Sequence, residues 1–179
     1  DPAIETDCKW LEEQAGAFRE NWAGRIATLS GDELATVIAT YEAMSDRTGR
    51  LMAFAYLTYA TDMSDGVRTR FFQGIQERIN GLTAQTLCFS LEGKHLEEAA
   101  LEELYGSSDA LAHDRPWLRD LRTRRDHRLS DDLERMLHER SITARSAWTR
   151  LFDDTIARLR FTIGGKEMPS QDALNLLSD

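Results

Sequence analysis

The sequence predicts a mainly α fold: a multi-helix antiparallel bundle with long helices and one small β-hairpin near the C-terminus. Apolar residues recur at steps of three and four over most of the 179 residues, which is typical of amphipathic helices. Residues 159–163 instead alternate apolar and polar side chains before the glycine pair 164–165, which predicts a hairpin. Long helices are permitted because there are only three prolines: Pro2, Pro116 and Pro169.

The first third of the chain predicts two or three helices. Apolar steps predict one helix over residues 3–28. A capping box, Ser30 to Glu33, begins the next helix. Residues 45–49 either break that helix or form one polar turn of a longer one. Residues 51–63 are apolar nearly all round, so we expect them at the centre of the bundle.

The middle of the chain predicts one long helix and two shorter ones. After a turn at 64–66, residues 67–89 repeat apolar side chains at a step near 3.5, which favours coiled-coil packing. A short acidic helix follows over 92–105. Residues 106–109 then form a loop and the next N-cap. A further helix covers 110–126, either continuous or interrupted at Pro116.

The last third predicts two capped helices, the hairpin and a final short helix. Ser130 and Thr143 are the expected N-caps, and residues 147–159 carry an apolar face after Thr143. Residues 166–168 are the expected return strand, and Ser170 is the expected cap of the last helix. Two domains follow from this pattern. Residues 1–158 form a helical N-terminal lobe, and 159–179 form a hairpin plus a short helix.

Composition excludes two classes of partner. The net charge of −9 and the pI of about 5.0 argue against a nucleic-acid partner. The longest apolar-rich run, residues 51–60, is too short to span a bilayer, so no membrane partner is expected. Cys8 and Cys88 are expected to be free thiols in a reducing, cytoplasmic setting, with a single disulfide as the alternative.

The four histidines predict no zinc site. His138-Glu139 begins like the zinc-peptidase motif H-E-x-x-H, but position 142 is Ile, and no two histidines lie four residues apart. We therefore interpret His138-Glu139 as a solvated helix face and His127 as structural. The predicted set of catalytic, cofactor-binding and metal residues is empty; the other histidines are His95 and His113.

Four other motifs also have structural interpretations. Cys8 and Cys88 lie on apolar stripes and are expected in the core rather than as nucleophiles. Gly164-Gly165 lacks the lysine of a phosphate loop and predicts a turn. The arginine run 115–128 is interleaved with aspartates, so a salt-bridged helix surface is favoured over a nucleic-acid or acidic-partner interface. Core or interface positions are expected for the aromatic pairs Tyr56/Tyr59 and Phe71/Phe72.

Many short segments together carry a family likeness. They are Tyr41-Glu42, Leu51, Tyr56-Leu57, Tyr59–Asp62, Trp117–Arg122, His127–Ser130, Glu134, Leu137, Ser141, Thr143, Ala147-Trp148, Leu151–Asp153, Leu159–Phe161 and Ala173–Leu177. In this order they resemble the N-terminal region of oligoendopeptidase F, a zinc oligopeptidase of the thimet-oligopeptidase superfamily.

The resemblance implies a helical lobe that forms one wall of a deep peptide channel and limits substrates to short, unfolded peptides. In that family the zinc-binding H-E-x-x-H helix and a downstream glutamate ligand lie far C-terminal to this region. None has a counterpart in residues 1–179. The resemblance therefore implies zinc in the parent enzyme, none bound by this inactive chain, and a C-terminal catalytic domain and short peptides as the parent's partners.

The same resemblance predicts an uncovered apolar surface. The channel-facing side of the lobe is expected to expose apolar or aromatic side chains, and the fragment is expected to form a homodimer through them. Two alternatives remain open. The acidic charge, missing site and coiled-coil-like stripe also fit a free-standing helical protein-interaction module without enzymatic activity. A weaker alternative is a nucleic-acid-binding domain that uses the run from Arg115 to Arg128.

Overall fold

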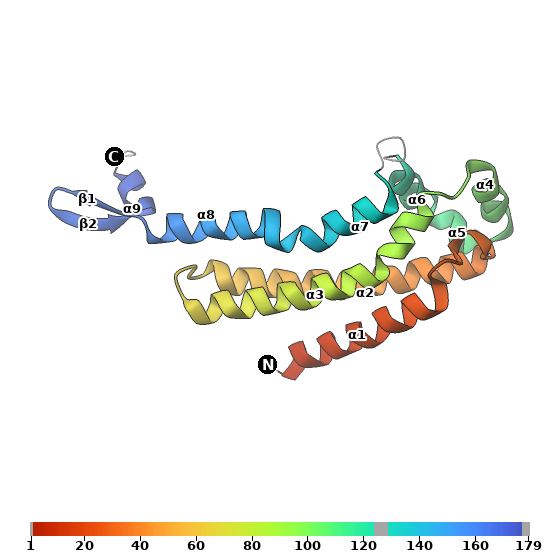
Figure 1. The fold of residues 1–179 in the computed structure, drawn as a ribbon, viewed down its shortest axis with the longest axis horizontal. Coiled ribbons are helices and arrows are strands. Elements are labelled where there is room, and N and C mark those ends of the chain that lie inside the picture. The colour runs from red at the N-terminus through yellow and green to blue at the C-terminus, as the bar shows by residue number, and fades with distance from the viewer. Residues whose placement is uncertain (1, 124–128, 177–179) are drawn as a thin grey trace. The chain divides into compact units, whose positions relative to one another are not determined.

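The computed structural model describes residues 2–123 and 129–176, without the side chain of Ile142 (Figure 1). The predicted mainly α fold with one small hairpin near the C-terminus is confirmed. The helices are α1 (Pro2–Trp22), η1 (Ile26–Thr28), α2 (Gly31–Ala60), α3 (Gly66–Gly93), α4 (Glu98–Ser107), α5 (Asp109–His113), α6 (Arg115–Arg122), α7 (Asp131–Arg140), η3 (Ile142–Ser146), α8 (Ala147–Arg158) and α9 (Ser170–Asn175), and the strands are β1 (Arg160–Ile163) and β2 (Lys166–Pro169).

The chain divides into two compact units, each made of two segments. Unit 1 consists of Asp1–Leu51 and Arg78–Glu139, and unit 2 consists of Met52–Glu77 and Arg140–Asp179. The long helices α2 and α3 contribute to both units, because residues 52–60 of α2 and 66–77 of α3 belong to unit 2. The predicted division at residues 158 and 159 stays a prediction.

An aromatic cluster from four helices forms the centre of unit 1. Phe89 of α3 is fully buried, and its ring contacts those of Phe18 of α1, Tyr41 of α2 and Trp117 of α6 at centroid distances of 5.8, 5.0 and 5.7 Å. The Phe89 and Trp117 rings stack, whereas Phe18 meets Phe89 edge-on. Both geometries suit the aromatic quadrupole, so this cluster fixes the relative positions of the four helices within unit 1.

The first helix is shorter than the predicted span 3–28, because α1 ends at Trp22. Gly24 adopts a φ of 77°, a left-handed conformation that ends helices and that glycine adopts without steric cost. The carboxylate of Glu92 then accepts hydrogen bonds from the backbone N–H groups of Gly24 and Ile26, at 2.7 and 3.2 Å. Residues 23–25 therefore form a turn that hydrogen bonds fix to the end of α3.

The second helix begins at its predicted cap and is continuous. The Ser30 N–H donates to the Glu33 carboxylate at 2.9 Å, and the Glu33 N–H donates to the Ser30 hydroxyl at 3.4 Å. This is the reciprocal capping box that the sequence predicts. Residues 45–49 are helical, so of the two alternatives the polar turn within a longer helix is correct.

The expectation that residues 51–63 lie at the centre of the bundle is wrong. Leu51, Ala55 and Tyr59 are buried, but Phe54 and Leu57 are 51% and 64% exposed. The buried face of this segment meets α3, where the ring of Tyr59 stacks on Phe72. A helix that is apolar on all sides is buried only where neighbouring elements pack against it. Here the face that carries Phe54 and Leu57 remains exposed to solvent.

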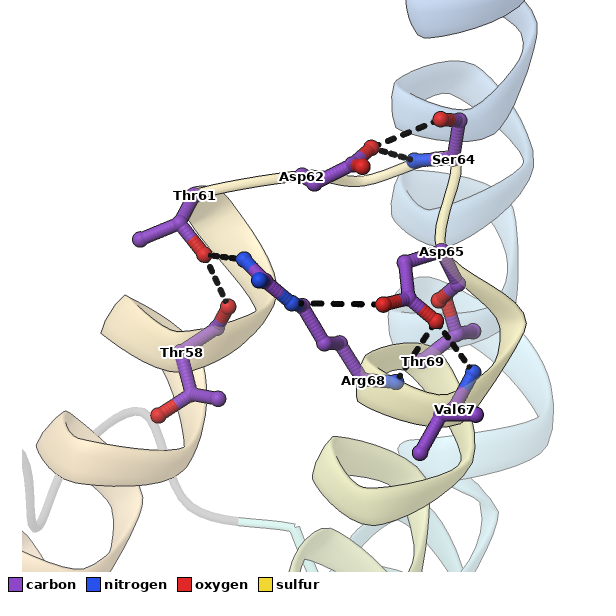
Figure 2. A network of polar contacts seen from close by, with 8 residues as sticks. All are labelled: Thr58, Thr61, Asp62, Ser64, Asp65, Val67, Arg68 and Thr69. Atoms are coloured by element: carbon purple, nitrogen blue, oxygen red, sulfur yellow. Dashed lines mark hydrogen bonds and ion pairs between the residues drawn. The ribbon is translucent and has the colours of Figure 1, made fainter.

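The turn between α2 and α3 spans residues 61–65, so it starts and ends earlier than the predicted 64–66, and a polar network holds it (Figure 2). The carboxylate of Asp65 accepts from the Val67 N–H at 2.7 Å and pairs with Arg68 at 3.3 Å. Arg68 also donates to the hydroxyl of Thr61, across the turn. Asp65 therefore satisfies the first turn of α3, whose predicted span of 67–89 is confirmed within Gly66–Gly93.

The predicted helix over 110–126 is interrupted. α5 ends at His113 and α6 begins at Arg115. Pro116 lies in the first turn of α6, where a backbone N–H would have no partner within the helix, so the proline does not remove a helical hydrogen bond. Ser108 caps α5, since its hydroxyl accepts from the Leu111 N–H at 3.3 Å. The predicted loop at 106–109 is shorter than expected, because α4 continues to Ser107.

Two predicted caps are wrong, whereas the helix after Ser130 begins as predicted at Asp131. Thr143 lies inside η3, a π-helical turn between α7 and α8, and its hydroxyl donates back to the Arg140 carbonyl at 3.3 Å. The Thr143 hydroxyl bonds to the preceding turn and, among the described residues, does not accept from an N–H of the following one. The helical path therefore continues through Thr143, and this residue is not an N-cap. Ser170 is the first helical residue of α9, because the N-cap position is occupied by Pro169.

The hairpin has the predicted turn. β1 and β2 pair antiparallel with Ile163 opposite Lys166 and Arg160 opposite Pro169. Gly164 and Gly165 connect the strands with φ angles of 60° and 79°. Two consecutive left-handed residues are what a tight two-residue hairpin turn requires, so the glycine pair specifies it.

Candidate functional site

The described residues contain no metal-binding cluster. Among residues 2–123 and 129–176, no three histidine, cysteine, aspartate or glutamate side chains lie close enough together to hold a metal ion. His95 lies 3.6 Å from the carboxylate of Asp131, and the two do not belong to a group of three potential ligands among the described residues. His127 lies outside the described residues, so its predicted structural role stays a prediction.

The interrupted zinc motif does not form a uniformly solvated face. Glu139 is exposed as predicted, but the Nε2 atom of His138 has no exposed surface and no hydrogen-bond partner among the described residues. His138 lies one helical turn after Glu134, whose carboxylate pairs with Lys94 at 3.1 Å in a largely buried contact. This face of α7 is therefore turned toward the protein, and the prediction for His138 is wrong.

The two cysteines are free thiols in the part of the chain that the structure describes, which decides against a disulfide between them. Cys8 is 1% exposed and Cys88 is half-buried. Burial raises the pKa of both thiols, so both stay protonated at neutral pH. A protonated, covered thiol is a poor nucleophile, which agrees with the predicted structural role.

The arginines of the run 115–128 form ion pairs, as predicted. Their partners are mainly glutamates of α4 and not the aspartates of the run itself. Arg115 pairs with Glu102 and Arg122 pairs with Glu98, so two arginines of α6 reach acids on α4. Arg119 makes the one described contact with an interleaved aspartate, Asp120, at 3.5 Å. The sequence could not predict the α4 partners because only folding brings α4 and α6 together. The remaining members of the run, Arg124, Arg125 and Arg128, lie outside the described residues.

A stripe of exposed apolar side chains, here called the α8 stripe, lies on α8. It consists of Trp148, Leu151, Phe152 and Ile156, at steps that place them on one helical face. They are 70%, 54%, 63% and 41% exposed. The resemblance predicts an exposed apolar surface on the channel-facing side, and that the stripe is this surface stays a prediction; the sequence pattern alone would suggest a buried face.

A groove of about 420 Å³ lies beside α8 within unit 2. Tyr56 and Phe72, whose rings lie 5.9 Å apart, form its aromatic part, and Gln76 binds Arg150 across it at 3.2 Å. The sequence predicted core or interface positions for these aromatic residues. The fold places Tyr56 and Phe72 at the groove, alongside Arg145, for which no role is predicted from the sequence.

A smaller, mainly apolar cavity of about 220 Å³ lies between α1, α2 and α3 in unit 1. Leu11, Met44 and Leu82 contribute apolar surface, and Thr86 and Ser45 contribute hydroxyl groups. The Thr86 hydroxyl already donates to the Thr83 carbonyl at 3.2 Å. The cavity therefore offers packing space but no charged group to orient a ligand.

Comparison with known proteins gives one match. Residues 92–161 match the family model of the N-terminal domain of the M3 peptidases, described as Oligopeptidase F. No curated protein and no solved structure matches the chain. No helix of the described residues combines the length and apolarity needed to cross a membrane. The matched segment runs from the end of α3 through α8 to β1, and over these residues the chain is similar to the N-terminal domain of oligopeptidase F, in agreement with the resemblance.

Proposed function

We propose that this chain is the N-terminal helical domain of an oligoendopeptidase F-like zinc metallopeptidase that hydrolyses short oligopeptides. In this proposal the chain forms a wall of the peptide channel, and the zinc-binding H-E-x-x-H helix belongs to a C-terminal catalytic domain. The match over residues 92–161 supports the family part of the proposal. The two free thiols are consistent with a reducing, cytoplasmic setting.

The α8 stripe is the observation that carries the proposal. It lies inside the matched segment, and Trp148 and Phe152 are its most exposed members. A contiguous apolar face of this kind is typical of a surface that another part of a protein covers. We infer that the catalytic domain covers the stripe in the parent enzyme and that the channel lies beside it.

The described residues do not fit a zinc ion, because they contain no group of three potential ligands. Hydrolysis is therefore assigned to the catalytic domain, and residues of this chain contribute to the channel and not to the metal site. Short, unfolded peptides are the substrates that the channel would admit in the parent.

Zinc content and peptide hydrolysis of the 179-residue chain test the assignment. We expect neither stoichiometric zinc nor turnover of a quenched fluorescent peptide. Adding a separately produced oligopeptidase F catalytic domain is expected to give a complex, and Phe152→Glu is expected to weaken it. Stoichiometric zinc together with turnover by the chain alone would contradict the proposal.

The alternative is a free-standing helical interaction module, and the same exposed stripe supports it. The two functions differ in what the gene encodes. A reading frame with H-E-x-x-H downstream of this region would exclude the module, whereas a stop codon directly after residue 179 would exclude the peptidase lobe.

A further inference from the structure

A basic pocket of about 260 Å³ lies between α4 and α6 in unit 1. Its origin is visible in the sequence, because α6 carries arginines at steps of four and three, which places them on one helical face. Neither the proposed peptidase function nor the interaction module uses this pocket. It is lined by Glu98, Tyr105, Arg115, Pro116, Arg119 and Arg122.

Two of the three arginines are held in place before any ligand arrives. Arg115 pairs with Glu102, and its guanidinium carbon lies 5.2 Å from the centre of the Tyr105 ring. Arg122 pairs with Glu98, and its side chain is only 12% exposed. Guanidinium groups that are already ordered lose little conformational freedom when a ligand binds.

The pocket has an unused donor. The Nε atom of Arg122 is buried and has no hydrogen-bond partner among the described residues. A guanidinium group carries five N–H donors and no acceptor, so this N–H needs an acceptor that none of the described residues supplies. Buried polar groups without partners are rare in folded proteins and call for a specific explanation.

Arg119 and Tyr105 supply two further donors. In the described part of the chain, the ion pair of Arg119 is a 3.5 Å contact with its neighbour Asp120, and its side chain is 77% exposed. Most of its guanidinium group is therefore available. Burial, together with the nearby carboxylate of Glu98, raises the pKa of Tyr105, so its hydroxyl stays protonated and can donate.

We propose that this pocket binds an oxyanion, a carboxylate or a phosphate group, between Arg119, Arg122 and the hydroxyl of Tyr105. Both groups offer several oxygen acceptors in the geometry that a guanidinium fork prefers. Glu98 and Glu102 already accept from Arg122 and Arg115, so the ligand uses the donors that these two pairs leave. The volume equals roughly nine water molecules at ~30 Å³ each, which suits a small molecule or a peptide terminus.

Nitrogen-15 NMR titration of the 179-residue chain at constant ionic strength tests the site and separates the two sources of oxyanion. The probes are inorganic phosphate, a tripeptide with a free C-terminal carboxylate, and the same tripeptide with an amidated C-terminus. We expect saturable amide shifts confined to α4 and α6 with phosphate, with the free tripeptide or with both, and none with the amide. No saturable shift with either oxyanion would overturn the proposal.

Matched variants identify the residues responsible. Arg119→Gln is expected to weaken binding about tenfold, since it removes one charged fork of the kind that binds oxyanions bidentately. The control Arg50→Gln removes the same charge from an exposed arginine of α2 that pairs with Asp46 at 2.9 Å, and it is expected to change nothing. If both variants weakened oxyanion binding equally, the net charge of the protein and not a specific site would explain the binding, and the proposal would be contradicted.

A second variant keeps the proposal testable if Arg119→Gln does not fold. Tyr105→Phe retains the ring over which Arg115 lies and removes only the hydroxyl. We expect it to weaken binding several-fold, and an unchanged affinity in this variant would contradict the assignment of the hydroxyl. The proposed oxyanion site does not depend on the proposed peptidase function, so either proposal can be wrong while the other stands.

Discussion

At the scale of single residues, Phe89 matters most for the stability of unit 1. It has no exposed surface, and aromatic rings from three other helices surround it. Removing its ring leaves a cavity that these neighbours cannot fill without moving. We expect Phe89→Ala to lower the free energy of unfolding by about 3–5 kcal/mol, measured by urea denaturation.

Phe152→Ala is the matched control for Phe89→Ala. Phe152 is the same residue type but is 63% exposed, so truncation removes little buried surface. The expected change in unfolding free energy is within about 0.5 kcal/mol. Similar losses for both variants would contradict the packing described for unit 1.

The capping box predicts that the stability of the protein depends on pH through one glutamate, Glu33. Hydrogen bonds from the backbone and side chain of Ser30 lower the pKa of Glu33. A folded-state pKa below the unfolded value stabilises the protein at pH values above the unfolded pKa, and this contribution disappears as the pH falls through the folded pKa. We expect Glu33→Gln to reduce the melting temperature at about pH 7, and this difference to shrink as the pH falls through the lowered pKa of Glu33.

Glutamine at position 33 can still accept the hydrogen bond from the Ser30 N–H, so the variant isolates the charge. The exposed Asp32→Asn, one residue earlier in the same helix turn, is a control for the general effect of the helix dipole. An equal pH dependence in both variants would indicate that the dipole, and not the capping box, causes the shift.

At the scale of elements, two glycines of α2 have opposite roles. A Cβ atom at Gly31 would lie 2.7 Å from the Cβ of Ser108 and 2.9 Å from the Leu104 carbonyl oxygen. The start of α2 therefore needs a glycine to approach the junction of α4 and α5. We expect Gly31→Ala to destabilise the protein by about 1–3 kcal/mol in thermal or urea unfolding.

Gly49→Ala in the same helix is expected to act in the other direction. No atom lies within 4 Å of a Cβ placed at Gly49, and the residue is helical. Alanine is preferred over glycine inside a helix by about 0.5–1 kcal/mol, so this variant is expected to be more stable. A loss of stability at Gly49 as large as at Gly31 would show that helix propensity does not explain the difference.

At the scale of the whole molecule, the uncovered α8 stripe predicts self-association. Trp148, Leu151 and Phe152 are each more than half exposed, and water-exposed apolar surface favours contacts between copies when no other partner is present. We expect sedimentation velocity to detect dimers of the isolated chain that Phe152→Glu shifts toward monomer.

Gln171→Glu is the control for this measurement, because it adds the same charge at an exposed position of α9, outside the stripe. It is expected to leave the dimer fraction unchanged. A monomer at high protein concentration for the unmodified chain would contradict the expectation that the stripe mediates contacts between copies.

Local sequence patterns were enough to predict most of the elements. The Ser30–Glu33 capping box, the turn at 61–65 and the Gly164-Gly165 hairpin are formed by residues within a few positions of one another. The interactions that determine these elements therefore depend only on short stretches of sequence. The caps expected at Thr143 and Ser170 failed because a serine or threonine can as readily bond backward or continue a helix.

Which helical faces are covered could not be predicted in the same way. His138 looked solvated but is turned inward, whereas the apolar segment 51–63 and the α8 stripe are partly uncovered. The donor set of Arg119, Arg122 and Tyr105 likewise exists only because α6 lies against α4. Periodicity within a helix identifies its faces, but burial depends on neighbours distant in the sequence, and those neighbours are known only once the chain has folded.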